Sequence, residues 1–424
     1  MKKRLIPILA LAAVSFMVVG CGGTALNSSW NWADASSDGT IKYTLLIGQI
    51  DHNDSAARTA GIRDALGTRG TVKTNANTED PVEGKLDING KTYKVIEVEH
   101  AEQKNTAGAT WDQQTATNTT ETWINKHATT TGYGNDIDLA VSNNDGMAVG
   151  AIGASNWIKD LPIFGYDSNA DMLQYIADGK TMGTINQNAS AQAAGIFMLA
   201  RNCIDDLGTD KVAKEGFSTA SSKGYGQISS NYTLNSTNNS MLVDNFKITK
   251  DNVSGYLGKT AKDLIDTKVT KGTTSKAKVW MSYYSQSDTF LNSNMKPLFD
   301  IYKDTFNFDI TALQGDGNSE NTVSDKLESA DNDFQAYIIN MIKTTSTATY
   351  LDMIATKTGA TEAKPSSVPV IFWNRQGTNA DGTVDSTVMH DKRFKYIYYV
   401  GFDAIQGGQL QGEMIVDWLK ANAK

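Results

Sequence analysis

Ten short apolar segments alternate with helix-like segments along most of this chain. Five lie in its first half and five in its second, at residues 43–48, 94–98, 138–142, 161–165, 184–186, 279–284, 309–313, 336–341, 369–373 and 396–401. Strands of almost continuous apolar character are buried on both faces, which is typical of parallel sheets covered by helices. Residues 55–66 and 146–158 are examples of the intervening helices. The pattern predicts an α/β protein with two doubly wound lobes.

Two regions interrupt this alternation. Residues 208–278 are rich in Ser, Thr, Asn, Gly and Lys, and within them only residues 241–248 have the character of a strand. Residues 259–278 contain many Lys and Thr and no aromatic residue, so we predict a linker there. A second excursion, residues 71–92, contains an Asn-Gly pair at Asn89 and Gly90, which predicts a surface hairpin.

The N-terminus has the pattern of an export signal. Lys2, Lys3 and Arg4 precede an apolar run at residues 5–19, which is too short to span a membrane comfortably. The run ends in VVGC at Cys21, the pattern of a bacterial lipobox. We therefore expect residues 1–20 to be a lipoprotein signal peptide, Cys21 to be lipidated and residues 21–33 to form a tether. An ordinary signal peptide with a chance cysteine is the alternative.

Charge and cysteine content narrow the functional classes. The formal net charge of −8 argues against nucleic acid as a partner, because phosphate binding needs clustered Lys and Arg. The charge suits a soluble protein that stays monomeric near a membrane, because like charges repel. Cys203 is the only other cysteine, so no disulfide within the chain is expected once Cys21 is lipidated. We expect Cys203 to be a buried apolar residue.

Polar side chains follow several of the predicted strands. Ligands of doubly wound sheets bind beyond the carboxyl ends of the strands. The polar residues at these positions are His52, Asp54, Arg58, Asn144, Asp167, Asp288 and Asn374, and Trp111 and Phe290 lie in equivalent loops. A single Asn or Asp there is commonly a helix N-cap. Together the set suits a pyranose, whose hydroxyls need donors and acceptors and whose ring faces pack on aromatic rings.

Several motifs resemble those of the periplasmic glucose/galactose-binding proteins. They are SNNDGMA at residues 142–148, LPIFGYD at 161–167, GQIDHNDSAAR at 48–58, ATWD at 109–112, the segment 368–375 and YYVG at 398–401. The resemblance implies two Rossmann-like lobes joined by hinge strands, the type I periplasmic binding protein fold. It also implies a receptor without enzymatic activity that delivers D-glucose or D-galactose to an ABC permease. Trp111 and Phe290 would sandwich the sugar, and Gln187 stands where the family usually has Asn.

The order of the motifs differs from that of the family. Family members begin with the lobe that starts here near Lys278, so this chain resembles a circular permutation like those of spirochaetes. The implied first lobe comprises residues 34–186, 247–258 and 402–424. The implied second lobe comprises residues 187–246 and 279–401, with the linker at 259–278. The hinge crossings are expected near Gln187, Phe246 and Val400.

The family also has a calcium loop. Asp34, Ser36, Asp38 and Thr40 have the oxygen spacing that begins such a loop, and Asp138 lies where a remote carboxylate would complete it. Lys42 occupies a position where the family supplies a Gln oxygen. An ammonium group cannot coordinate a cation and could replace one by pairing with Asp34 and Asp38. The sequence leaves both readings open, and no other cofactor is expected.

Two other functions compete with transport. A sugar-sensing subunit that signals to a chemoreceptor is compatible with every motif. A glycoside-processing enzyme could use Asp54 and Asp167 as acid and base. Against the enzyme, these carboxylates have partners such as Arg58, and the set of side chains surrounds a monosaccharide without space for a leaving group.

Overall fold

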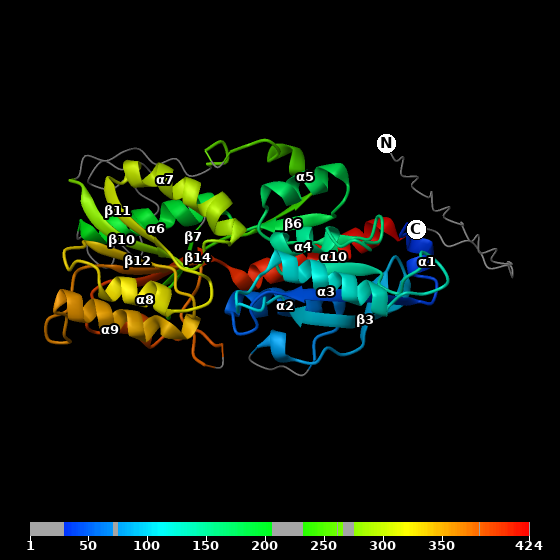
Figure 1. Ribbon diagram of the computed structural model, residues 1–424, viewed down its shortest axis with the longest axis horizontal. Coiled ribbons are helices and arrows are strands. Elements are labelled where there is room, and N and C mark those ends of the chain that lie inside the picture. Colours follow the sequence, from blue (N-terminus) through cyan, green and yellow to red (C-terminus); the bar gives the residue numbers. More distant parts are fainter. Residues whose placement is uncertain are drawn as a thin grey trace, which may run out of the picture.

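The computed structural model describes residues 29–70, 75–205, 232–260, 262–265, 275–380 and 382–423. The signal segment, Cys21, most of the predicted tether and half of the predicted linker lie outside these residues. The described chain forms two α/β lobes, each built on a seven-stranded sheet (Figure 1). No helix in these ranges is long and apolar enough to cross a membrane.

The first lobe has the strand order β2-β3-β1-β4-β5-β6-β9. Its strands are β1 (Thr40–Ile47), β2 (Gly84–Ile88), β3 (Lys91–Glu102), β4 (Leu139–Ser142), β5 (Ile163–Phe164), β6 (Gly183–Asn186) and β9 (Phe246–Thr249). Its helices are α1 (Trp32–Ala35), α2 (Asn53–Leu66), η1 (Ala76–Thr78), α3 (Gln113–Lys126), α4 (Asp145–Ile152), α5 (Ala170–Asp178), η3 (Val253–Gly255) and α10 (Ala404–Asn422). The five central strands are parallel, whereas the edge strands β2 and β9 run antiparallel to their neighbours.

The second lobe has the order β11-β10-β12-β13-β14-β8-β7. Its strands are β7 (Tyr232–Asn235), β8 (Ser240–Val243), β10 (Ala277–Tyr283), β11 (Phe308–Gln314), β12 (Ala336–Ile339), β13 (Val370–Trp373) and β14 (Ile397–Phe402). Its helices are α6 (Ala189–Ile204), the π-helix η4 (Phe290–Met295), α7 (Lys296–Thr305), α8 (Asn321–Glu328), η5 (Thr344–Ser346), α9 (Thr347–Thr358) and η6 (Val388–His390). Every pairing is parallel except that of β7 with β8.

Buried apolar residues pack each sheet against the helices that cover it. In the second lobe a single cluster joins the strands to the helices that cover them, and it includes Trp280 and Trp373. In the first lobe one cluster covers each face, around Leu45 on one side and Leu46 on the other. Adjacent side chains of one strand thus enter opposite cores, because they alternate across the pleat. This confirms the predicted pair of doubly wound lobes.

The chain crosses between the lobes at residues 187–188, 244–245 and 403. The prediction of one strand at residues 241–248 is wrong, because β8 and β9 belong to different sheets. Asn245 stabilises the crossing between β8 and β9. Its side-chain amide group donates to the carbonyl oxygen of Asp403 at 2.7 Å, and its backbone N–H donates to Gln406 at 2.7 Å. Phe246 therefore begins β9 in the first lobe, whereas the sequence boundaries assign it to the second.

The two ends of the described chain meet on the first lobe. The last helix, α10, returns to this lobe (Figure 1). Its Trp418 ring lies 5.8 Å from that of Phe164. Trp418 is also 5.7 Å from Trp30, which shows that the end of the predicted tether is folded. Asn89 donates to the carbonyl oxygens of Lys420 and Ala423 at 2.8 and 2.9 Å. Such proximity of the ends is what the permutation implied by the motif order requires.

The Asn-Gly turn connects β2 to β3. Asn89 and Gly90 both have positive φ, 51° and 83°, as a two-residue hairpin turn requires. The hairpin is more than a surface excursion, because β3 is also the strand predicted at residues 94–98 and pairs with β1. The sequence analysis missed β2 and β7, which are short edge strands.

Candidate ligand-binding site

One cavity between the lobes gathers all ten side chains singled out in the sequence. They are His52, Asp54, Arg58, Trp111, Asn144, Asp167, Gln187, Asp288, Phe290 and Asn374. Tyr284 and Arg375, which the sequence analysis did not name, complete the lining. The space between these side chains, including its opening to solvent, is about 330 Å³. Side chains of both lobes thus face one cavity.

Three lining residues adopt a backbone conformation that is rare outside glycine. The φ angles of Trp111, Asp167 and Asn374 are 60°, 120° and 59°. Such conformations are unfavourable for a bulky residue and cluster at functional sites, where the surrounding structure maintains them. Here each aims a functional side chain from a loop that follows a strand. Packing supports this at Trp111, because a Cβ atom on Gly48 would lie 2.3 Å from its ring.

The beginning of α2 supplies the first group of polar side chains. The His52 imidazole caps the helix, since its Nδ1 accepts a hydrogen bond from the backbone N–H of Asp54 at 3.1 Å. Burial and the positive charges of Arg375 and Arg58 lower the pKa of His52 well below its usual value. The imidazole is therefore neutral at pH 7, and with Nδ1 accepting, its Nε2 carries the proton and is a donor.

Asp54 presents a buried carboxylate to the same space. Burial raises the pKa of Asp54 to about 7, although the guanidinium groups of Arg58 and Arg375 act in the opposite direction. Its side chain accepts no hydrogen bond from any residue within the described ranges, and Asp54 is only 3% exposed. The Asp54 carboxylate can thus accept hydrogen bonds from a ligand. A ligand that donates to it would stabilise its ionised form.

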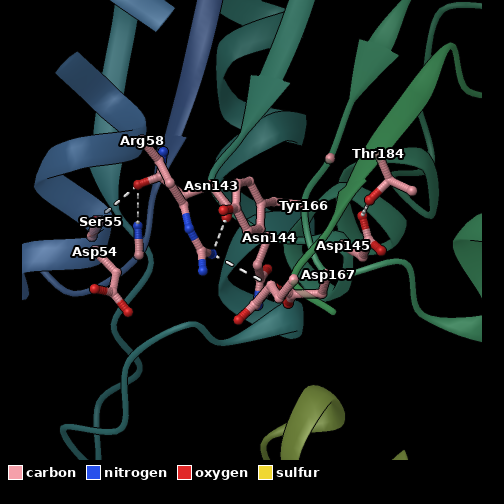
Figure 2. A network of polar contacts seen from close by, with 12 residues as sticks. Asp54, Ser55, Arg58, Asn143, Asn144, Asp145, Tyr166, Asp167 and Thr184 are labelled. Atoms are coloured by element: carbon pink, nitrogen blue, oxygen red, sulfur yellow. Dashed lines mark hydrogen bonds and ion pairs between the residues drawn. The ribbon is translucent and has the colours of Figure 1, made fainter. Parts of the chain in front are cut away.

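Arg58 lies at the centre of a polar network in the first lobe (Figure 2). Its Nη1 donates to the carbonyl oxygen of Asn143 at 2.6 Å and lies 3.7 Å from Oδ1 of Asp167. The guanidinium group stacks 3.7 Å from the centre of the Tyr166 ring. The Tyr166 hydroxyl donates to hinge residue Asn245 at 3.0 Å. These contacts restrict Arg58 to one orientation, so its remaining N–H groups are held ready for a ligand.

Asp167 joins the network to a hinge segment. Gln187 donates from Nε2 to Oδ1 of Asp167. Burial raises the pKa of Asp167 well above its usual value; Arg58 opposes this effect, and Asp145 and Asp288 add to it. Gln187, which stands where the resemblance leads one to expect Asn, therefore contacts the carboxylate directly.

Asn144 has both a structural and a ligand-facing role. Its Oδ1 accepts from the backbone N–H of Met147 at 2.8 Å and so caps α4. The amide group of the same side chain borders the cavity. Asn144 can therefore cap α4 and also contact a ligand.

The second lobe closes the other side of the cavity. Oδ1 of Asp288 accepts from the backbone N–H of Leu291 at 2.8 Å, and Oδ2 accepts from the Tyr284 hydroxyl. Asn374 accepts at Oδ1 from Asn340 at 3.2 Å, which leaves its own amide N–H groups as donors. Arg375 stacks 3.6 Å from the centre of the Tyr284 ring and donates to Gln49 of the first lobe at 2.9 Å. The conformation is therefore a closed one.

Several polar atoms that line the cavity lack a partner within the described part of the chain. They are Nε of Arg58, Nε1 of Trp111, Oε1 of Gln187 and Nε of Arg375. Buried donors and acceptors without partners are costly. Donors and acceptors in such numbers suit a ligand that carries many hydroxyl groups.

The predicted calcium loop has a different set of contacts. Lys42 Nζ lies 2.6 Å from Asp136 and 3.3 Å from Asp38. Asp138 accepts from the Tyr133 hydroxyl at 2.7 Å and from the backbone N–H of Lys42 at 2.6 Å, and burial raises the pKa of Asp138 to about 7. Ser36 is the C-cap of α1, and Thr40 is the first residue of β1.

Asp34, the first residue of that loop, accepts from the Asn31 amide at 2.7 Å. Among the described residues, no group of three or more His, Cys, Asp or Glu side chains is arranged to hold a metal. The ammonium group of Lys42 pairs with Asp38, which is one of the expected calcium ligands, and with Asp136, which is not, instead of with Asp34 as the sequence suggested. We propose that Lys42 takes the place of a calcium ion in this loop.

We expect chelation to leave the thermal stability of the protein unchanged, because Lys42 supplies the positive charge in this loop. Lys42→Met should lower the free energy of unfolding by about 1 kcal/mol, since Asp38 and Asp136 lose a partly buried ion-pair partner. Thermal unfolding with and without EDTA measures both effects. A transition of the wild-type chain that falls with EDTA and recovers with Ca²⁺ would contradict this account.

Comparison with known proteins places the fold in a family. A family model described as a periplasmic binding protein domain matches residues 19–208, and a second model with the same description matches residues 276–347. Together the matches cover more than half of the chain. Both lobes contribute to the matched residues.

Individual relatives are distant. The D-galactose/methyl-galactoside binding periplasmic protein MglB of Haemophilus influenzae is 29% identical over 43% of this chain and 44% of its own length. A xylitol-binding protein of Mycolicibacterium smegmatis is 28% identical over 39% of this chain and 48% of its own length. The chain thus matches about half the length of these curated relatives.

Among solved structures, an ABC transporter solute binding protein from Agrobacterium vitis with bound D-fucose has a TM-score of 0.47 and 9% identity, covering 90% of each chain. The matches to the two family models, taken with the two-lobe architecture, establish the family. The chain belongs to the periplasmic binding proteins.

Proposed function

We propose that this protein binds a free hexose, D-glucose or D-galactose, between its lobes and delivers it to an ABC transporter. One observation carries the proposal: one cavity is lined from both lobes by carboxylates, carboxamides, guanidinium groups and the aromatic rings of Trp111, Tyr284 and Phe290. A pyranose has hydroxyls that both donate and accept, and C–H faces that pack on flat rings. The lining supplies partners for both.

The distribution of these partners supports a receptor that closes around its ligand. Asp54, Arg58 and Asp167 belong to the first lobe, and Asp288 and Asn374 to the second. A sugar bound to one lobe alone would leave hydroxyls unpaired, so the ligand favours the closed form. A permease that recognises the closed form would receive only loaded protein.

The family and the N-terminal pattern support an extracytoplasmic location. We propose that the chain is exported, lipidated at Cys21 and anchored to the membrane as a monomer. The printed names of the Haemophilus and Mycolicibacterium relatives refer to galactose, methyl-galactoside and xylitol. All are polyhydroxylated molecules, which favours a ligand of this class.

Calorimetric titration of the chain without residues 1–21 tests the proposal. D-Glucose or D-galactose should bind with a dissociation constant of about 1 µM or tighter, roughly 8 kcal/mol. Xylose and ribose, which lack the sixth carbon, should bind more weakly. No heat change with either hexose at millimolar concentration would overturn the proposal.

Experiments can distinguish transport from the two alternatives, a glycoside-processing enzyme and a sugar-sensing subunit. Asp167 is engaged by Gln187 and faces Arg58, which favours binding over catalysis. Incubation with aryl glycosides should therefore release no aglycone. A sensing role would show as binding to a chemoreceptor by the sugar-loaded chain, and this outcome would extend the proposed function.

Affinity for the hexose should rise with pH through about 7. A sugar hydroxyl that donates to Asp54 stabilises the carboxylate, so the ligand lowers a pKa that burial has raised to about 7. Binding then releases a proton near and below pH 7, and affinity falls as the pH falls. Titrations from pH 5.5 to 8.5 should show this slope in the wild type. The Asp54→Asn variant, which cannot titrate at this position, should bind weakly and lose the part of the slope that Asp54 contributes, whereas a flat wild-type profile would contradict the assignment. Any slope that remains in the variant is assigned to Asp167, whose pKa burial also raises.

A further inference from the structure

A small group of polar side chains joins the lobes beside the ligand cavity without lining it. Asn169 of the first lobe donates from Nδ2 to the Thr289 hydroxyl at 3.0 Å. Its Oδ1 accepts from Nδ2 of Asn294 at 3.1 Å. Asn294 also lies 3.4 Å from the carbonyl oxygen of Asp167. Thr289 and Asn294 belong to the second lobe, so these contacts exist only when the lobes are closed.

Asn169 forms this contact instead of a local one. It occupies the N-cap position of α5, yet its side chain makes no hydrogen bond to that helix. Asn is among the most favourable N-cap residues, and a cap of this kind is worth about 1 kcal/mol. Asn169 is 7% exposed, and its side chain hydrogen-bonds to the other lobe instead of capping α5.

The partner side of the contact is built into a ligand-binding element. Phe290 and Asn294 lie on the same π-helix, η4, and Phe290 borders the cavity. Single π-helical turns occur frequently at functional sites. The helix thus places an aromatic platform at the ligand and a carboxamide at the opposite lobe.

We propose that Asn169, Thr289 and Asn294 form a clasp that stabilises the closed form independently of the sugar and so sets affinity without contacting it. The proposal rests on hexose binding in the adjoining cavity. The observed dissociation constant of a ligand is its intrinsic value divided by the fraction of protein in the competent conformation. A residue that changes only the closing equilibrium must therefore change the affinity for every ligand by the same factor.

The Asn294→Ala variant tests this directly. We expect affinity for D-glucose and for D-galactose to fall by the same factor, about tenfold, with faster sugar release in stopped-flow fluorescence. The matched control is Ser293→Ala on the same helix, an exposed position, which should bind as the wild type does. Asn169→Ala combined with Asn294→Ala should weaken binding by less than the sum of the two single changes, because both remove the hydrogen bond between Asn169 and Asn294.

Two outcomes overturn the clasp. Unchanged affinity in Asn294→Ala would show that the contact does not favour closure. Unequal effects on the two sugars would show that Asn294 contacts the ligand. If the wild type binds neither hexose, the proposed function fails, and the clasp is judged on the ligand-free chain with one fluorescent dye on each lobe. Energy transfer should then indicate a more open distribution in Asn294→Ala, and an unchanged distribution would refute the clasp.

Discussion

Replacing Asp167 by Ala should weaken hexose binding by about 2–4 kcal/mol, a loss of roughly thirtyfold to a thousandfold. The change removes an acceptor for sugar hydroxyls and leaves the Gln187 amide and Arg58 without their carboxylate partner. Calorimetric titration measures the loss. The fold should persist, because removing a carboxylate whose pKa burial has raised also removes a cost of desolvation.

Two further variants separate a ligand contact from a structural role at this position. Asp167 has a φ of 120°, where Ala is strained, so Asp167→Asn provides a variant of nearly the same shape without the charge. It should also bind weakly while its thermal transition stays close to that of the wild type. Asp171→Ala, at an exposed position on α5, should leave affinity unchanged. Wild-type affinity in both Asp167 variants would remove this residue from the site.

Replacing Trp111 by Ala should produce a loss of similar size, about 2–4 kcal/mol. The indole ring stands at the cavity wall, and without it one face of the pyranose loses its apolar platform. Trp111→Phe keeps a flat ring and should lose less affinity than Trp111→Ala. Titration of the two variants with the same hexose measures the difference.

Gly48 provides an independent check on the tryptophan. A Cβ at Gly48 would lie 2.3 Å from the indole ring, so Gly48→Ala must displace Trp111 although it replaces no side chain that contacts the ligand. We expect this variant to lose much of the affinity that Trp111→Ala loses. Full affinity in both Trp111→Ala and Gly48→Ala would show that the indole ring does not support the sugar.

Much of the fold could be predicted from the sequence because parallel strands leave a clear local signal. All ten predicted strands have counterparts, and several of them, for example β1 and β10, are buried along almost their whole length. The segment 241–248 could not be divided correctly, because its apolar pattern continues while the chain passes from one sheet to the other. That break depends on contacts of Asn245 with Asp403 and Gln406, which are about 160 residues away in sequence.

The candidate site could be predicted where a polar residue follows a strand. His52, Asn144 and Asn374 carry that local signal, and the structure brings them to one cavity. Tyr284 and Arg375 also follow strands, but their roles were harder to predict. An aromatic residue at the end of a strand is commonly a core residue. Arg375 comes directly after Asn374, which was already assigned to the site.

The supporting residues are harder to predict. Tyr166 acts beneath Arg58 through the stacking of its ring, and the capping position of Asn169 conceals a contact with the opposite lobe. Both roles arise from three-dimensional proximity across the chain, for which neighbouring residues give no pattern.

A crystal structure of the soluble chain with D-glucose or D-galactose tests the central claim most directly. The account predicts a closed protein with one pyranose between Trp111 and Phe290. Its hydroxyls should be within hydrogen-bond distance of Asp54, Asp167 and Asp288, so that both lobes contact the same sugar. A hexose bound elsewhere, or bound to one lobe of an open protein, would contradict the account.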